Sequence, residues 1–130
     1  MARNIALKLN VPVGLWLDGD PQRLRQLLQN LLANSCRYVE SDGRVEITLT
    51  QQEGKTELTL DDSGPGLQPD QLSRLFERFY RAEESRSRLG GGSGLGLSIC
   101  RNIVEAHQGS IQAQASSLGG LCIRVVLPGG

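Results

Sequence analysis

The stretch RVEITLTQQEGKTELTLDDSGPG, residues 44–66, predicts an antiparallel hairpin that ends in a glycine-containing turn. Two segments alternate between apolar and polar residues, and Glu53-Gly54 stands between them, where a short turn is expected. The period-2 pattern predicts an inner face made of Val45, Ile47, Leu49, Leu58 and Leu60. One side of this hairpin is therefore expected to pack against helices.

Asp62 follows Leu60 by two positions, so the same alternation points its carboxylate to the inner face. A buried carboxylate is costly unless hydrogen-bond donors meet it. One candidate donor is the exocyclic amine of adenine, since Gly64 and Gly66 would let a flat ring lie close to the backbone. The other is the chain itself, in a turn where Asp61 or Asp62 bonds its own backbone. This stretch leaves both open.

Upstream of the hairpin, the sequence predicts a helix from Pro21 to about Tyr38, with Asp20 as its N-cap. Five leucines recur at one-turn spacing and predict one buried face: Leu24, Leu27, Leu28, Leu31 and Leu32. Asn30, Asn34 and Arg37 lie together on the rim of this face, with Tyr38 at the margin. Such a group could offer oxygens to Mg²⁺ and donors to phosphate, or be an ordinary polar flank.

The remaining elements alternate between strands and helices. Residues 5–10 (IALKLN) predict a short strand, with 14–19 (GLWLDG) as a candidate partner. A short helix is expected at 69–79, and two closing strands at 110–116 and 121–127. A third helix is expected from about Gly94 to His107, with an apolar stripe of Ile99, Cys100, Ile103 and Ala106. This order predicts one sheet with its helices on one face, a two-layer α/β sandwich.

A glycine run, GGGSGLGLSIC from Gly90 to Cys100, stands where the third helix begins. Backbone N–H groups at a helix start are unpaired, and glycines let a phosphate approach them without clashing with Cβ atoms. The run contains neither a Gly-Lys-Ser/Thr step nor a GxGxxG pattern. By itself it is equally well explained as a linker.

Composition limits the partners that the chain can have. Lys plus Arg and Asp plus Glu both number 14 in 130 residues, so no surface driven by bulk charge is indicated and no nucleic acid is expected. No apolar run approaches the roughly 18 residues of a membrane span, and the start lacks a signal-peptide pattern. Three separated cysteines, Cys36, Cys100 and Cys122, are expected to be core residues in a reducing compartment.

Five segments together resemble the sequence boxes of sensor histidine kinases, in the right order and over essentially the whole chain. QLLQNLLANSCRY resembles the N box, DDSGPG the first glycine box and LFERFYRAEESRSR the F box. GGSGLGLSI resembles the second glycine box, and LGGLCIRVVLP the closing glycine-containing hairpin. The detail is most similar to envelope-stress kinases of the BaeS type. The resemblance implies the Bergerat fold: a mixed, mostly antiparallel sheet, three helices on one face and a long ATP lid.

The resemblance also implies a role for each matching residue of the first helix and the hairpin. Asn34 would coordinate Mg²⁺, with Asn30 near the waters of the metal or the phosphates. Arg37 would contact a phosphate and Tyr38 the adenosine. Asp62 would bind the adenine amine, in a pocket shaped by Gly64 and Gly66.

Further roles fall on the segment between the hairpin and the last helix. Arg81, with Arg78, would approach the γ-phosphate of ATP. The second glycine box would close on the triphosphate through Gly92, Gly94, Leu95, Gly96 and Leu97. The ATP lid would run from Leu67 to about Gly91, with the glycine run as its hinge.

The sequence departs from the family pattern at two positions and lacks one family motif, and these three differences affect the activity that we expect. Ser35-Cys36-Arg37 stands where the family more often has Ala-x-Lys, so the phosphate contact of Arg37 changes geometry but keeps its charge. Asn30 stands where hydrolytic relatives have a glutamate that activates water, so slow hydrolysis is expected. No His-Glu/Asp motif is present, and the one histidine, His107, is expected to be a helix-end residue.

Residues 1–130 are therefore expected to be a catalytic ATP-binding domain, monomeric by itself, from a longer receptor. Its dimerisation, sensor and membrane parts would be absent, and it would lie on the cytoplasmic side of the bacterial inner membrane. Its partners would be the histidine-bearing dimerisation domain and then a response regulator, and its cofactors ATP and Mg²⁺. The alternatives are a self-sufficient ATPase of the same fold and a serine kinase of the anti-sigma type.

Overall fold

A sheet of five strands forms one layer of the described chain, in the order β1-β2-β3-β5-β4. The computed structural model describes residues 5–11, 19–38, 43–64, 66–77 and 96–129, with the backbone alone at 36–38. The strands are β1 (Ala6–Asn10), β2 (Arg44–Gln52), β3 (Lys55–Asp62), β4 (Ser110–Ala115) and β5 (Leu121–Pro128). Only the β1–β2 pair is parallel among these strands, so the predicted mixed, mostly antiparallel sheet is confirmed.

The central hairpin forms as the alternation predicts. β2 and β3 pair antiparallel up to Gln52 and Lys55, and the turn between them has positive φ at Glu53 (53°) and Gly54 (76°). Two consecutive positive φ angles match the twist of the flanking strands. Four inner-face residues are buried, Val45, Ile47, Leu58 and Leu60, and Leu49 is partly buried against them.

The partner of β1 in the structure is β2, with Leu7 beside Val45 and Leu9 beside Ile47. The partner considered from the sequence, 14–19, falls outside the described residues except for Gly19. Leu7 and Leu9 are 54% and 59% exposed, because β1 stands at one end of the strand order.

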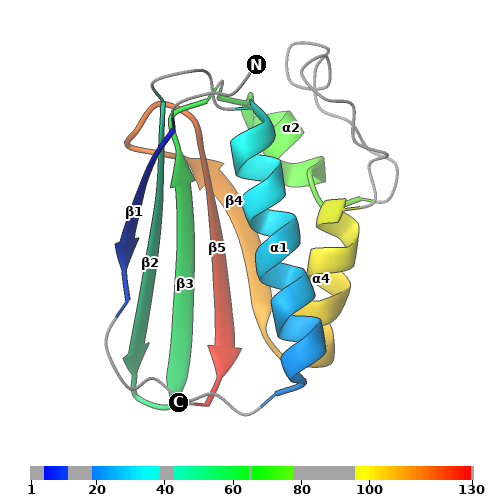
Figure 1. The fold of residues 1–130 in the computed structure, drawn as a ribbon. Coiled ribbons are helices and arrows are strands. Elements are labelled where there is room, and N and C mark those ends of the chain that lie inside the picture. Colours follow the sequence, from blue (N-terminus) through cyan, green and yellow to red (C-terminus); the bar gives the residue numbers. More distant parts are fainter. Residues whose placement is uncertain (1–4, 12–18, 39–42, 65, 78–95, 130) are drawn as a thin grey trace.

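Among the residues that the structure describes, the second layer is made of the helices α1 (Pro21–Tyr38), α2 (Pro69–Arg74) and α4 (Gly96–Ala106). All three lie on the same side of the sheet (Figure 1). The predicted two-layer α/β sandwich with its helices on one face is therefore confirmed. The buried cluster between the layers draws on both, for example Leu31 and Ile103 from the helices and Leu60 and Ile123 from the strands.

The cap and the buried face of α1 follow the sequence, with one exception. The Asp20 carboxylate accepts hydrogen bonds from the backbone N–H groups of Gln22 (3.0 Å) and Arg23 (3.3 Å). Leu27 and Leu31 are buried, whereas Leu28 is 43% exposed, so the expectation that Leu28 belongs to the buried face was wrong. At about 100° per residue, Leu28 lies on the flank of α1 away from Asn30, the flank that does not face α4.

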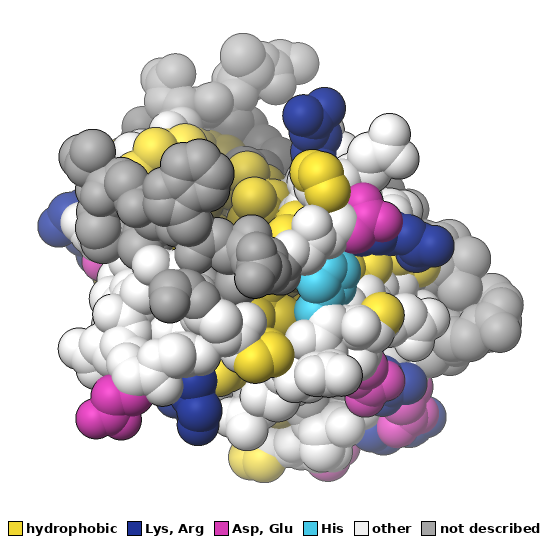
Figure 2. Space-filling model, turned by 90° about the horizontal axis from the view of Figure 1, so that it is seen from below, with side chains coloured by type: hydrophobic (Ala, Val, Ile, Leu, Met, Phe, Trp, Pro, Cys, Tyr) yellow, Lys and Arg dark blue, Asp and Glu magenta, His cyan; other side chains and the backbone are white. Residues whose placement is uncertain are grey.

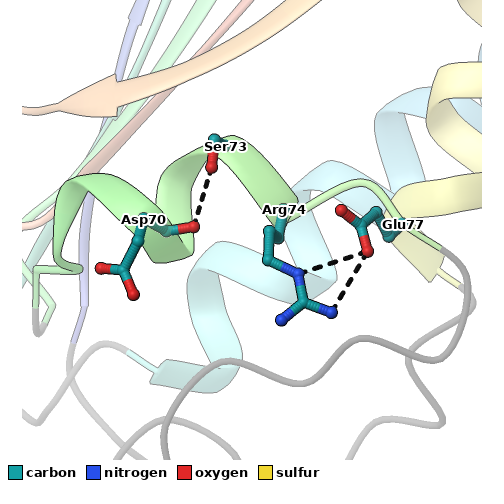
Figure 3. Close-up of polar contacts among 4 residues, drawn as sticks. All are labelled: Asp70, Ser73, Arg74 and Glu77. Atoms are coloured by element: carbon teal, nitrogen blue, oxygen red, sulfur yellow. Dashed lines mark hydrogen bonds and ion pairs between the residues drawn. The ribbon is translucent and has the colours of Figure 1, made fainter.

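α2 is shorter than the sequence predicts. α2 ends at Arg74 rather than continuing to 79, because Leu75 and Phe76 turn into the core. The end of α2 is held by exposed polar contacts (Figure 3): Ser73 Oγ donates to the Asp70 carbonyl (2.8 Å), and Arg74 pairs with Glu77 (3.3 Å).

In α4, Ala106 is exposed and so does not belong to the apolar stripe, contrary to expectation. Val104, one turn after the fully buried Cys100, is itself fully buried. The last turn of α4 therefore buries Ile103 and Val104 rather than Ala106.

Candidate functional site

The predicted site residues that the structure describes come from segments that meet at one end of the molecule. The C-terminal half of α1, the end of β3 and the start of α4 all lie at the upper end in Figure 1. The turn between β4 and β5, residues 116–120, lies at the same end. The opposite end holds the start of α1 and the end of α4.

Asp62 is wholly buried at the end of β3, as the alternation predicted. Its Oδ1 atom accepts hydrogen bonds from the backbone N–H groups of Gly64 (3.0 Å) and Leu121 (3.1 Å). The Gly64 contact is the local turn that the sequence left open. The Leu121 contact comes from 59 residues away, and sequence reasoning did not find it.

Gly120 is the second site residue that sequence reasoning missed. Its N–H donates to the Asp62 carbonyl (3.1 Å). A Cβ atom at Gly120 would lie 2.2 Å from Asp62 Oδ1 and 2.6 Å from the Gly64 carbonyl oxygen, so only glycine fits. The sequence does contain a signal, because the closing LGGL segment resembles a family box, but that resemblance implies no role for an individual residue.

The turn that contains Gly120 also contacts the other side of β3. Ser116 Oγ donates to Asp61 Oδ1 (2.7 Å), and the Leu118 N–H donates to Ser116 Oγ (3.0 Å). Two further backbone bonds close the turn, from Ser116 N–H to the Gly120 carbonyl (2.9 Å) and from Gly119 N–H to the Ser116 carbonyl (3.0 Å). Gly66 lies beside it, since a Cβ there would be 3.4 Å from the Gly119 carbonyl oxygen.

Asn34 is half-buried on α1, and its side-chain Nδ2 is buried without a hydrogen-bond partner in the described structure. An orphaned amide of this kind is rare, and it fits a residue that acts on a group from outside the chain. The amide oxygen of Asn34 is a hard ligand of the type that Mg²⁺ takes, usually together with waters and nucleotide phosphates. The described residues include no group of three or more His, Cys, Asp or Glu able to hold a metal ion. Its amide oxygen and its orphaned Nδ2 together fit a residue that contacts Mg²⁺ and a phosphate.

Asn30 lies one turn before Asn34, where α1 meets α4. Its neighbour there is Cys100, whose thiol also approaches the Leu27 carbonyl (3.9 Å). Burial raises the pKa of Cys100 to about 12, although the hydrogen bond with Asn30 acts in the opposite direction. The second glycine-box helix is thus packed directly on the helix that carries both asparagines.

Gly96 and Leu97 are the only predicted phosphate-binding residues among the described positions of the second glycine box. Gly96 begins α4, and a Cβ there would meet nothing within 4 Å. Nothing in the described packing therefore requires glycine at Gly96. Leu97 is partly buried and packs against the core.

Other predicted site residues lie outside the described residues. They are Arg78, Arg81, Gly92, Gly94 and Leu95, together with most of the lid at 67–91. The side chains of Arg37 and Tyr38 are not described either.

His107 stands at the end of α4, as the sequence predicted. Its Nδ1–H donates to the Ile103 carbonyl (2.8 Å), and its Nε2 accepts from the backbone N–H of Asp20 (3.1 Å). The tautomer follows from the N–H of Asp20, which can only donate. Figure 2, the view from below, shows the single histidine in cyan with an acidic side chain beside it. This end of α4 lies opposite the end of β3 that carries Asp62 (Figure 1). His107 joins α4 to α1 and is remote from the candidate site.

Three further facts concern the surface charge, the concavities and the helices of the described residues. On the face seen in Figure 2, acidic and basic side chains are scattered and neither sign forms a broad area. A groove of about 460 Å³ lies between α2 and β4, lined by Leu72, Phe76, Ile111 and Ala113 among others, and it contains none of the predicted site residues. No helix among the described residues is long and apolar enough to cross a membrane.

Residues 19–130 match the family described as histidine kinase-, DNA gyrase B-, and HSP90-like ATPase. Signal transduction histidine-protein kinase BaeS of Escherichia coli K12 is 51% identical over 127 residues, which are 98% of this chain and 27% of that protein. Sensor histidine kinase CpxA of the same strain is 38% identical over 124 residues, or 95% of this chain and 27% of that protein. The chain thus spans about a quarter of the length of these relatives.

Solved structures of histidine kinases have the same fold. Mycobacterial sensor histidine kinase MprB superposes with a TM-score of 0.86 at 34% identity, covering 96% of this chain and 84% of that chain. The nucleotide-free catalytic domain of histidine kinase ThkA gives 0.85 at 26% identity, covering 97% and 81%. Full-length ShkA in complex with AMPPNP gives 0.78 at 29% identity, covering 97% and 26%. By sequence and by fold, this chain belongs to the histidine kinase-, DNA gyrase B- and HSP90-like ATPase family, within which it is similar to the catalytic domains of sensor histidine kinases.

Proposed function

We propose that this chain binds ATP with Mg²⁺ and donates the γ-phosphate to a histidine on a separate dimerisation domain, in two-component signal transduction. The observation that carries the proposal is Asp62, a fully buried carboxylate held in one orientation by two backbone N–H groups. A carboxylate fixed in this way selects a donor such as the exocyclic amine of adenine and rejects the carbonyl of guanine. Family membership supports ATP as the ligand.

In this proposal the two asparagines of α1 bind the metal and the phosphates of the nucleotide. Asn34 offers its amide oxygen to Mg²⁺, and its unpartnered Nδ2 is available to a further acceptor. Asn30, on the same flank, is placed near the waters of the metal or the phosphates, and Arg37 at a phosphate oxygen. Bound Mg²⁺ supplies charge neutralisation on the triphosphate, which is most of what phosphoryl transfer needs beyond positioning.

The remaining roles are proposed from the matching boxes. Tyr38 packs against the adenosine, and Gly64 and Gly66 line the adenine pocket. Arg78 and Arg81 neutralise the γ-phosphate. The second glycine box closes over the triphosphate through Gly92, Gly94, Leu95, Gly96 and Leu97. The unfilled space beside Gly96 supports this role, because the described packing gives no other reason for a glycine there.

The partners of the chain follow from the relatives that it resembles. The phosphoacceptor is a histidine on a dimerisation domain of the same receptor, and a response regulator receives the phosphate next. His107 is unsuited to that role, since both of its ring nitrogens are engaged within the fold. The receptor would present this domain on the cytoplasmic side of the bacterial inner membrane, and the domain by itself would be a monomer.

Calorimetric titration tests the nucleotide site directly. The chain is titrated with ADP and with a non-hydrolysable ATP analogue, each with and without Mg²⁺, and with GDP as the base control. Adenine nucleotides are expected to bind more tightly with Mg²⁺, and GDP is expected not to bind. Absence of adenine nucleotide binding up to millimolar concentrations would remove the proposal.

Single substitutions test the adenine side and the metal side of the site separately. Asp62→Asn should weaken ADP about tenfold or more, since a bond to a charged group is lost, and Asn34→Ala should remove the Mg²⁺-dependent part of binding. Glu105→Gln is the control, because Glu105 is exposed near the end of α4, at the end of the molecule opposite Asp62. An Asp62→Asn variant with unchanged ADP affinity would contradict the adenine assignment. Rapid ATP turnover by the chain alone would instead favour a self-sufficient ATPase.

A further inference from the structure

The turn from Ser116 to Gly120 holds the end of β3 from both of its faces. Asp61 and Asp62 are consecutive strand residues, so their side chains point to opposite faces of the sheet. Ser116 bonds the Asp61 side chain on one face, while Leu121 bonds the Asp62 side chain on the other. Gly120 bonds the Asp62 carbonyl between them. We call this arrangement, Asp61–Asp62 with Ser116–Leu121, the β3 clamp.

From this geometry we infer that Ser116 and Asp61 are positioning residues for nucleotide recognition, acting through the clamp on the orientation of Asp62; the inference rests on the proposed function. Neither residue touches the base in this scheme. Ser116 sets the turn in place, the turn presents the Leu121 N–H to Asp62 Oδ1, and that bond fixes the rotation of the carboxylate.

The bonds within the clamp explain why one hydroxyl has this influence. Ser116 Oγ both donates to Asp61 (2.7 Å) and accepts from the Leu118 N–H (3.0 Å), so it joins the turn to β3 through a single atom. Gly119 has a φ of 101°, a conformation that few other residues adopt, so the turn has one preferred shape. A rigid turn transmits a displacement at Ser116 to Gly120 and Leu121.

The Gly120 contact makes the coupling sensitive to small displacements. The Cα of Gly120 stands so near Asp62 that even a Cβ would overlap Oδ1. If the bond between Ser116 and Asp61 is lost, the turn can shift and change the surroundings of the Asp62 carboxylate. The sheet itself is less affected, because β3 keeps its pairing with β2 and β5.

The test compares nucleotide affinity with stability in four single variants. Ser116→Ala removes the tether, Asp61→Ala removes its acceptor but leaves Ser116 to cap Leu118, and Ser116→Thr keeps a hydroxyl. Ser117→Ala is the matched control, because Ser117 is an exposed neighbour in the same turn. Affinities for ADP and GDP are measured by calorimetry, and stability by urea unfolding, on the whole chain.

Ser116→Ala and Asp61→Ala are each expected to weaken ADP about tenfold and to reduce the preference for ADP over GDP, with Ser116→Thr restoring both. The double variant should bind ADP no more weakly than Ser116→Ala, because the bond between Ser116 and Asp61 is already absent from that single variant. Ser117→Ala should match the parent chain.

Three results would overturn the inference. In the first, ADP affinity is unchanged in Ser116→Ala and in Asp61→Ala but falls in Asp62→Asn. This result would overturn the inference about the clamp and would not affect the proposed function. A fall in stability with ADP affinity and base preference both retained would show a structural role only. Unchanged affinity in Asp62→Asn as well would overturn the proposed function together with this inference.

Discussion

The imidazole Nε2 of His107 accepts a hydrogen bond from the backbone N–H of Asp20, 87 residues earlier in the chain, at 3.1 Å. The same ring donates from Nδ1 to the Ile103 carbonyl, so it is fixed at both nitrogens. Gly19 lies directly beneath it, since a Cβ there would be 2.9 Å from the ring. One side chain thereby fastens the end of α4 to the start of α1.

Replacing His107 by alanine is expected to lower the free energy of unfolding by about 1 kcal/mol, because the Asp20 N–H and the Ile103 carbonyl each lose a partner at a partly exposed site. Urea denaturation measures the change. ADP affinity should stay within twofold of the parent, since His107 is at the far end from Asp62. Glu105→Ala, an exposed position on the same helix, is the control. Loss of ADP binding in His107→Ala would contradict this placement.

Alanine at Gly96 and alanine at Gly120 should have opposite effects on stability. Gly96→Ala should leave stability unchanged or raise it by up to about 1 kcal/mol, because alanine favours helix and the space there is open. It should nevertheless weaken adenine nucleotides, since the new Cβ stands where phosphate is proposed to approach. Gly120→Ala should cost at least about 1–3 kcal/mol through overlap with Asp62. Urea unfolding and calorimetry on both variants distinguish the nucleotide-binding role of Gly96 from the packing role of Gly120. A Gly120→Ala variant as stable as the parent chain would contradict the clamp geometry.

The thiols of Cys100 and Cys122 should resist alkylation in the folded chain. The pKa of both is raised to about 12, mainly by burial, and at Cys122 also by Asp61 and Asp62. Both thiols are therefore expected to stay protonated at pH 8, and the thiolate is the reactive form. Iodoacetamide labelling of a Cys36→Ser variant, followed by mass spectrometry, should show no adduct under native conditions and two in urea. Labelling of the folded variant within minutes would disagree with this burial.

The pKa of Glu57 is lowered, first by its hydrogen bond from Arg124 (2.7 Å) and also by the charge of that guanidinium. A lowered pKa means that the contribution to stability is present above the ordinary pKa of a glutamate, about 4.3, and is lost as the pH falls through the folded value. Because the pair is exposed, the contribution is expected to be small. Glu57→Gln should lower the urea midpoint slightly at pH 7 and not at pH 3. An equal difference at both pH values would exclude the ion pair as its cause.

The parts of the fold that the sequence predicted are those with local causes. The positive φ angles at Glu53 and Gly54 and the cap at Asp20 follow from residues within a few positions. The burial of Asp62 followed from simple alternation after Leu60. These patterns were enough to predict the layers and most of the sheet.

The incorrect predictions have non-local causes. Leu28 fits the helical period, yet it is exposed because α4 packs on the other flank of α1. The end of α2 could not be predicted, because Leu75 and Phe76 leave the helix to reach the core. Within the site, the donors from Leu121 and Ser116 lie more than 50 residues from Asp61 and Asp62, where no local pattern connects them.

The position of β5 has a consequence for how this chain folds as it is synthesised. β5 is the last of the five strands to leave the ribosome, yet it lies between β3 and β4 in the sheet. Until Leu121–Pro128 has emerged, β4 lacks its neighbour and β3 has one bare edge. The native sheet is then completed when β5 inserts between β3 and β4. Such long-range pairing is slow, and it leaves strand edges open to association with other nascent chains.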